Sequence, residues 1–515
     1  MRLAIAGQRT LIALAALFSI ALIARLATVW LVAGPLERPV TYEHGEIAAN
    51  LAAGRGFVVR FLGTEGPTSQ QAPLYPALVA GCYALFGTES PRAIAAVQLV
   101  QAVAGAALVL LVVALVRGCL PERPRAAWCA GLLAALYPPH VYMVTHVQVA
   151  VWAALALTGL VAAAVRPRFH ATCTGAACLG ALAGLLLLIE PIHVVALPIV
   201  ALIVWRGSVV PVEDLQHGQG QQHGQGQLHG LRQQHGQGQQ PRIGGALRVA
   251  VLVASCTVVV APWLYRNARV HGELVFVKST FGYAFWQGNH PLSWGTDKIP
   301  KPSAQPLRPT HDGSLHDQHR ALWEARHETV YIDDVILGPQ GHARFAGLSE
   351  PARSELLGRE AWGYIAAEPL RYAELCVRRL GYLLVRDPTN PKTAHPLYRW
   401  STAVWLGLAL AGLFAAWPLR QRLWPTVAVF LAVLLFHAAT IASARFRIPL
   451  EPLALVWGGL AIDRLAAAAA SWWSQRDLQT HSEGSRSSRL AHTSISGHSR
   501  ASTPASSSTA KRSVA

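Results

Sequence analysis

LIALAALFSIALIARLATVWLV, residues 11–32, is the first long apolar run of the chain, and the acidic string YEHGEIAAN, residues 42–50, follows soon after it. About 20 apolar residues are enough to cross a bilayer as a helix. The run is too long for the apolar core of a cleaved signal peptide, Arg25 interrupts it, and no small-residue cleavage site follows it. We therefore expect a retained membrane helix that leads into an acidic segment at the water interface.

Further apolar runs fill much of the rest of the chain. Of its 515 residues, 52% are hydrophobic and 14% are charged, and the mean hydropathy is +0.31, which excludes an ordinary water-soluble globule. The pattern predicts an all-α integral membrane protein with about ten transmembrane helices. They are expected near residues 11–32, 92–116, 126–138, 147–164, 172–188, 192–205, 245–264, 400–417, 424–442 and 448–462.

Arginines beside these runs predict the orientation of the chain, because basic residues next to a span favour the cytoplasmic side. If successive runs alternate in direction, the basic loops fall on one face, and both termini lie in the cytoplasm. The residues concerned are Arg2, Arg9, Arg117, Arg123, Arg125, Arg166, Arg168, Arg206, Arg420, Arg422 and Arg464. These loops account for much of the net charge of +17, so no nucleic-acid partner is expected.

The segments between the runs divide the chain into parts. Two of them, a Gln/Gly/His-rich loop and a Ser/Thr/Arg-rich tail, have compositions typical of disorder and are expected in the cytoplasm. The expected parts are a membrane bundle (1–206) with a first outer loop carrying short helices (34–91), the disordered loop (207–243), one membrane helix (244–265), an extracytoplasmic region (266–398), the last membrane helices (399–463) and the disordered tail (464–515).

Glu43 and Glu46 make the acidic string a candidate for proton transfer. At this spacing a helix would put both on one face with Asn50, and Gly54 would end that helix. Like charges near a low-dielectric slab tend to raise one pKa, which prepares a carboxylate to accept a proton. The alternative is the solvated face of an interfacial helix.

Arg445 and Arg447 lie in the short loop between the last two runs, and they break the charge rule because that loop falls on the outer face. One explanation is an ion pair with Glu451 or another carboxylate. The other is a phosphate site, since a guanidinium binds phosphate oxygens in pairs. Arg266 and Lys278, just beyond the seventh run, could join such a site.

A base and phosphate-binding cations on one outer face suggest transfer of a group from a lipid phosphate to a hydroxyl or an amine. Phosphate is a good leaving group, so the reaction needs no general acid. It needs a base that deprotonates the acceptor and a cation that holds the departing charge.

Several strings along the chain resemble the membrane glycosyltransferases of family 39, a GT-C group similar to protein O-mannosyltransferases and to the lipid A aminoarabinose transferases of bacteria. Their order and their common placement at outer membrane edges carry the resemblance, which covers most of the chain. They are YEHGEIA (42–48), GRGF (54–57), GPT (66–68), PLYP (73–76), FG (86–87), PWLYRN (262–267), FG (281–282), WQGNHP (286–291) and RFRIPLEP (445–452).

The resemblance implies a polyprenyl-phosphate sugar as donor and an acidic residue of the first outer loop as catalytic base. Glu43 matches that position, where relatives commonly have aspartate, often in an Asp-Glu pair, so Glu46 stays an alternative. Gln148 stands where relatives often have glutamate. Dependence on a divalent metal ion varies among such enzymes, and a metal cofactor is left open.

Other polar residues at outer edges are candidates for contact with the sugar or the acceptor. They are Asn289, His290, Glu190 and Tyr75. For the first three, a turn, a helix cap or a buried hydrogen bond is the alternative role.

The sequence therefore predicts a glycosyltransferase of the bacterial inner membrane, active on the outer face, that transfers a sugar to a glycan, lipid or protein. Glu43 is the expected base, and Arg447 with Arg266 is expected at the lipid phosphate. The main alternative is a transporter or flippase of a lipid-linked or anionic substrate, which should show hydropathy repeats and charges in mid-membrane. Another is a family member without catalysis.

Overall fold

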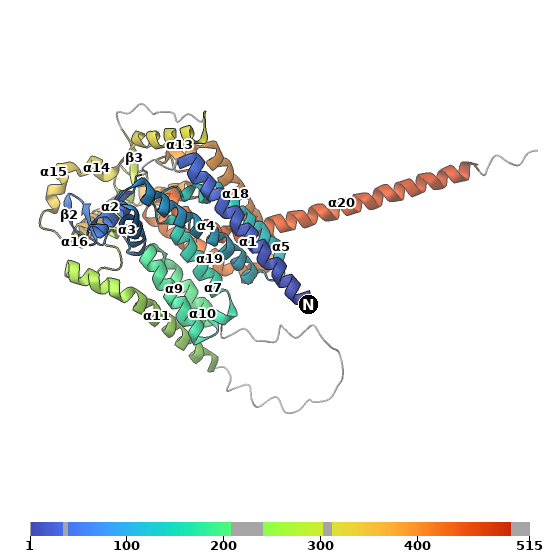
Figure 1. The fold of residues 1–515 in the computed structure, drawn as a ribbon, viewed down its shortest axis with the longest axis horizontal. Coiled ribbons are helices and arrows are strands. Elements are labelled where there is room, and N and C mark those ends of the chain that lie inside the picture. The colour runs from blue at the N-terminus through green and yellow to red at the C-terminus, as the bar shows by residue number, and fades with distance from the viewer. Residues whose placement is uncertain (1, 34–39, 208–239, 302–311, 496–515) are drawn as a thin grey trace, which may run out of the picture. The chain divides into compact units, whose positions relative to one another are not determined.

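The structure, a computed structural model, describes residues 2–33, 40–207, 240–301 and 312–495, and these are mostly helical (Figure 1). Every predicted apolar run forms a helix. These helices are α1 (Arg2–Thr28), α4 (Pro91–Cys119), α5 (Pro124–Leu136), α7 (Ala150–Ala164), α9 (Cys173–Ile189), α10 (Leu197–Arg206), α11 (Gln240–His271), α18 (Pro396–Ala415), α19 (Arg420–Thr440) and α20 (Glu451–Ile495).

Five helical stretches are long and apolar enough to cross a membrane, which confirms the predicted all-α membrane fold. They are Gly7–Val32, Pro91–Cys119, Gly244–His271, Trp417–Thr440 and Glu451–Arg476. Shorter apolar helices, among them α7 and α9, pack beside them with a shared core. The count of ten spans and the orientation of the chain stay predictions.

Arg25, the charge inside the first apolar run, is fully buried between helices. Its guanidinium donates to the carbonyl oxygens of Ala21 at 2.9 Å and Ala135 at 3.2 Å. Because α5 ends at Leu136, Arg25 satisfies carbonyls that the end of a short helix would leave without partners in apolar surroundings. Gly105 of α4 leaves room for this, since a Cβ there would lie 2.5 Å from Nε of Arg25.

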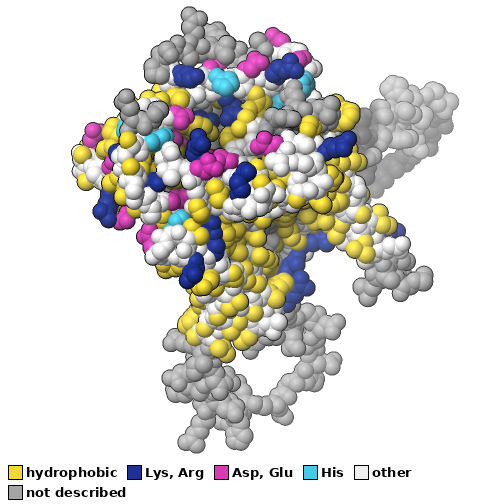
Figure 2. Space-filling view, turned by 60° about the vertical axis from the view of Figure 1, so that its left-hand side comes forward, with side chains coloured by type: hydrophobic (Ala, Val, Ile, Leu, Met, Phe, Trp, Pro, Cys, Tyr) yellow, Lys and Arg dark blue, Asp and Glu magenta, His cyan; other side chains and the backbone are white. Residues whose placement is uncertain are grey.

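The elements outside the long helices include two small antiparallel sheets of two strands each. Figure 1 shows α2, β2, α14, α15 and α16 at one end of the helical bundle, away from the start of α1. Around that end charged side chains gather, above a band of apolar ones (Figure 2). The main elements are α2 (Tyr42–Ala52), β1 (Val58–Phe61), β2 (Thr64–Pro67), α3 (Leu74–Phe86), α6 (Pro138–Met143), η2 (Pro191–Ala196), α12 (Phe281–Asn289), β3 (Lys298–Pro300), α13 (Leu315–Glu324), β4 (Thr329–Tyr331), α14 (Ile332–Ile336), α15 (Gly338–His342), α16 (Glu350–Ala367), α17 (Pro369–Leu384) and η8 (Ala444–Arg447).

The chain divides into two units, Met1–Ile462 and Asp463–Ala515. Helix α20 continues into the second unit as far as Ile495, and the disorder that the sequence predicts for the tail stays a prediction. The repeat-containing loop between α10 and α11 lies mostly outside the described residues. The candidate site belongs to the first unit.

Candidate functional site

A cavity of about 660 Å³ lies where α2, α12, η2, α19 and η8 meet. Part of its wall is apolar, and many polar side chains converge on the rest, a combination typical of ligand sites. The polar lining residues are Tyr42, Glu43, His44, Gln70, Gln71, Gln148, Glu190, His193, Lys278, Thr280, Tyr283, Gln287, Asp297, Tyr331, Asp333, Asp334, His437 and Arg445.

Glu43 enters the cavity from the first turn of α2. The preceding residue, Tyr42, has a φ of 53°, a left-handed conformation that is uncommon for a residue with a bulky side chain and that is concentrated at functional sites. Gly45 makes this start possible, because a Cβ there would lie 2.0 Å from the side chain of Thr41. Tyr42 and Gly45 thus set the backbone at the start of α2, from which the Glu43 side chain enters the cavity.

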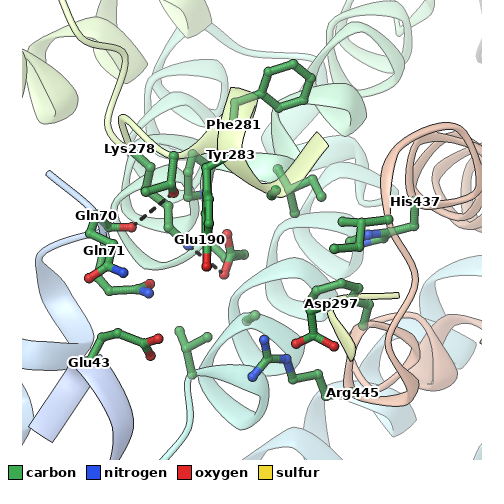
Figure 3. Close-up of a pocket in the computed structure, with 18 of the residues that line it drawn as sticks. Glu43, Gln70, Gln71, Glu190, Lys278, Phe281, Tyr283, Asp297, His437 and Arg445 are labelled. Carbon is green, nitrogen blue, oxygen red and sulfur yellow. Dashed lines mark hydrogen bonds and ion pairs between the residues drawn. The ribbon is translucent and has the colours of Figure 1, made fainter. Parts of the chain in front are cut away.

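Glu43, Asp297 and Arg445 point into the cavity from α2, from the residue before β3 and from η8 (Figure 3). Among the described residues, none of these three side chains has a hydrogen-bonding or ion-pair partner. Burial lowers the pKa of Arg445, but nearby Asp297, Tyr331 and Glu43 raise it by more. The three charges therefore interact across the cavity while each keeps its polar atoms available to a ligand.

Lys278 and Glu190 also line the cavity, but they face each other. Nζ of Lys278 lies 3.2 and 3.5 Å from the two carboxylate oxygens of Glu190 (Figure 3). Both side chains are about one-fifth exposed, at 19% and 22%. Sequence reasoning placed both residues at the site, and the structure adds that their charges compensate each other.

His44 lies behind Glu43, and its Nδ1 has no partner among the described residues. Burial lowers the pKa of His44 to about 3, so its ring is neutral at physiological pH. The ring meets that of Tyr75 edge-on, with 4.9 Å between the centroids. Tyr75 itself does not line the cavity, and its hydroxyl donates to Gln101 at 2.8 Å. Tyr75 thus contacts His44 of the cavity wall without lining the cavity itself.

Arg447 lies outside the cavity, although it is two residues from Arg445. It is fully buried, with Nε 2.6 Å from the Glu451 carboxylate, and it also donates to Tyr398 and Thr402 at 3.0 Å. The sequence offered two explanations for these arginines, an ion pair with Glu451 and a phosphate site. Arg447 forms the ion pair. Arg445 lines the cavity and stays the candidate for the phosphate site.

Arg266 also lies outside the cavity and has protein partners. It donates to the carbonyl oxygens of Thr68 at 2.6 Å and Phe57 at 3.3 Å, and its guanidinium lies 4.7 Å from the centre of the Trp263 ring. These contacts join the end of α11 to the segment that contains β1 and β2. The structure therefore does not bring Arg266 together with Arg445.

Glu46, Asn289 and His290 likewise do not line the cavity. Glu46 is exposed and accepts from the backbone of Arg60 at 2.9 Å, which attaches α2 to β1. Asn289 is buried and accepts from Arg379 at 2.8 Å, and Nδ1 of His290 accepts from the backbone of Leu292 in a turn. Their contacts match the structural alternatives stated above.

Several lining residues were not predicted, above all Asp297 and Asp333. Gln287 donates to Asp333 at 2.8 Å, and burial raises the pKa of that carboxyl. Both acids fall in the region between α11 and α18, outside the strings that carry the family resemblance. Pairing of β3 with β4 brings Asp297 close to the chain before Asp333, as the bond from Ile332 N to Asp297 O at 3.1 Å shows.

In the described part of the chain, no group of three or more His, Cys, Asp or Glu side chains is placed to hold a metal ion. The carboxylates that line the cavity come from α2, from the residue before η2, from the residue before β3 and, as the adjacent pair Asp333 and Asp334, from α14. The metal cofactor left open by the sequence stays open, and no role below depends on it.

No protein-family model and no curated protein matches the chain. It is similar to the oligosaccharyltransferase AglB of Archaeoglobus fulgidus, solved with an inhibitory peptide and a dolichol-phosphate, at 14% identity and a TM-score of 0.48, over 91% of this chain and 51% of that chain. It is also similar to ArnT of Cupriavidus metallidurans, solved with undecaprenyl phosphate, at 15% identity and a TM-score of 0.38, over 88% of this chain and 79% of that chain. The chain thus spans about half the length of AglB.

Proposed function

We propose that this protein is a glycosyltransferase that moves a sugar from a polyprenyl-phosphate donor to a glycan, lipid or protein acceptor, on the outer face of a bacterial inner membrane. One observation carries the proposal: Glu43, Asp297 and Arg445 converge on a single cavity of a membrane protein, and none of them has a hydrogen-bonding or ion-pair partner in the part of the chain that the structure describes. A base and a cation that face the same space are what such a transfer requires.

In the proposed reaction, Arg445 binds the donor phosphate. The bond between the anomeric carbon and the phosphate oxygen breaks, the phosphate keeps the electron pair, and Arg445 stabilises the charge that develops. The acceptor hydroxyl or amine forms the new bond to the anomeric carbon and gives its proton to the Glu43 carboxylate. Asp297 faces the same space without contacting Arg445 and offsets part of its positive charge before the donor arrives.

The apolar wall of the cavity supports a lipid-linked donor. Phe276 and Phe281 both line the cavity and are 48% and 58% exposed, so the wall continues to the surface of the protein. Exposed aromatic side chains beside a cavity suit an apolar ligand, here the first prenyl units. The phosphate then lies at the charged end and the lipid chain along the aromatic side.

The transporter alternative gains no comparable support. Arg25 is the deep charge that the sequence offers to such a mechanism, and it is occupied in holding the end of α5. An ion or substrate pathway would need that guanidinium to change partners.

Glu43→Gln is the direct test, and Glu46→Gln is its matched control on the same helix. We expect Glu43→Gln to slow transfer of sugar from polyprenyl phosphate in membranes by about 10²–10⁴-fold, the usual contribution of a general base. Glu46→Gln should stay within about twofold, since Glu46 is exposed and outside the cavity. Full activity of Glu43→Gln would disprove the proposed mechanism.

A further inference from the structure

His193 of η2 and His437 of α19 are buried polar side chains that the proposed reaction does not yet use. They line the cavity and are only 1% and 2% exposed. Both ring nitrogens of His193 and Nδ1 of His437 lack a hydrogen-bond partner in the described structure. Buried polar atoms are nearly always paired, so unpaired ones that line a cavity indicate a ligand that pairs with them.

Each imidazole is linked through a neighbouring residue to one of the two cavity cations, Arg445 and Lys278. His437 stacks on Phe446, with 4.4 Å between centroids and 14° between planes, and Phe446 follows Arg445 directly. Figure 3 shows His437 on the same side of the cavity as Arg445. His193 belongs to the 3₁₀ turn that begins after Glu190, the partner of Lys278.

We propose that His193 and His437 complete a phosphate site with Arg445 and Lys278, each imidazole donating an N–H to a phosphate oxygen of the lipid carrier. The inference rests on the proposed function, since it assigns further residues of the same site. The donor is a phosphodiester and the carrier left after transfer is a monoester; the ionised phosphate of either offers acceptor oxygens alone, which suits a wall of two cations and two N–H donors. Two carboxylates also face these cations: Glu190 is paired with Lys278, and Asp297 offsets part of the charge of Arg445 without contacting it.

The aromatic side chains beside these histidines favour a lipid phosphate over a soluble one. Phe436, the neighbour of His437, lies 6.1 Å from Phe281 between ring centroids, and both line the cavity. An anion held by the imidazoles would therefore have apolar surface next to it. That arrangement fits a phosphate that carries a prenyl chain.

The test is direct binding of a labelled short polyprenyl phosphate to the purified full chain in detergent, with the uncharged polyprenol of equal length and inorganic phosphate as comparison ligands. His437→Phe keeps a ring against Phe446 and removes the nitrogens. We expect His437→Phe and His193→Phe each to weaken phosphate-lipid binding by about tenfold, the usual value for a hydrogen bond to a charged group. Polyprenol binding should be unchanged, and inorganic phosphate should compete weakly.

His327→Phe is the control, because His327 is exposed and does not line the cavity. His437→Gln and His193→Gln, which keep an N–H donor, should recover part of the affinity, and a thermal melt of each variant confirms folding. Unchanged phosphate-lipid binding in folded Phe variants would overturn this inference alone, as would an equal loss of polyprenol binding or tight binding of inorganic phosphate. Absence of phosphate-lipid binding by the unaltered chain would overturn the proposed function as well.

Discussion

Arg445 and Arg447 belong to one short turn, yet they have opposite surroundings. Arg447 is enclosed, with a carboxylate at 2.6 Å and two hydroxyl groups at 3.0 Å. Arg445 projects into the cavity, and among the described residues its guanidinium has no hydrogen-bonding or ion-pair partner. A buried charge requires partners to offset its desolvation, and a charge at a cavity can leave that role to a ligand. The comparison separates a residue that holds the fold from one available for chemistry.

Arg447→Met should give the largest effect of the substitutions considered for these charged residues, a loss of stability. It leaves Glu451 buried beside Tyr137 and His140 without its cationic partner, and we expect a loss of about 3–5 kcal/mol in the free energy of unfolding. Thermal or denaturant unfolding of the purified protein measures this loss. The double variant Arg447→Met with Glu451→Leu should recover much of it, because no charge is then left unpaired. If Arg447→Met were as stable as the unaltered chain, Arg447 would not be a residue that holds the fold.

Arg445→Gln should give the second largest effect, on binding and transfer. We expect donor affinity to fall by about 10–100-fold, since a hydrogen bond to a charged group contributes roughly 1.5–3 kcal/mol. The melting temperature should stay close to that of the unaltered chain, because no described protein partner loses a bond. Binding of labelled donor and a melt on the same sample check both halves. A large loss of stability with normal binding would reverse the roles assigned to the two arginines.

The sequence predicted the elements of this fold better than their contacts. Long apolar runs determine where helices form, and a short acidic helix ending near Gly54 is confirmed as Tyr42–Ala52, with Gly54 at a φ of 73°. The residue pattern also put both arginines at one edge. It could not separate them, because a pair with Glu451 was open to either arginine, and the other partners of Arg447 come from residues 383, 384, 398 and 402, which only the packed structure brings to it.

The same limit explains the acidic residues. Helical spacing put Glu43 and Glu46 on one face, but Glu46 is turned to the backbone of β1, which the sequence does not place beside α2. Asp297 was missed because it lies outside the strings that carry the family resemblance and reaches the cavity through the pairing of β3 with β4. Local pattern predicts helices, whereas this cavity is assembled from segments more than 400 residues apart in the chain, from Tyr42 to Arg445.

Glu190→Gln should give the smallest effect, and in the opposite direction. If an unpaired cation is what binds the phosphate, then freeing Lys278 from Glu190 should strengthen binding of a polyprenyl phosphate by about two- to fivefold, because a partly exposed ion pair contributes no more than about 1 kcal/mol. Lys278→Gln, the matched loss of the cation, should weaken the same binding. Weaker binding by Glu190→Gln would mean that Glu190 holds Lys278 in place for the ligand. An ion pair inside the cavity would then position its cation for the ligand. The rule that a paired charge holds the fold while an unpaired one binds a ligand would apply only to fully buried pairs such as Arg447 with Glu451.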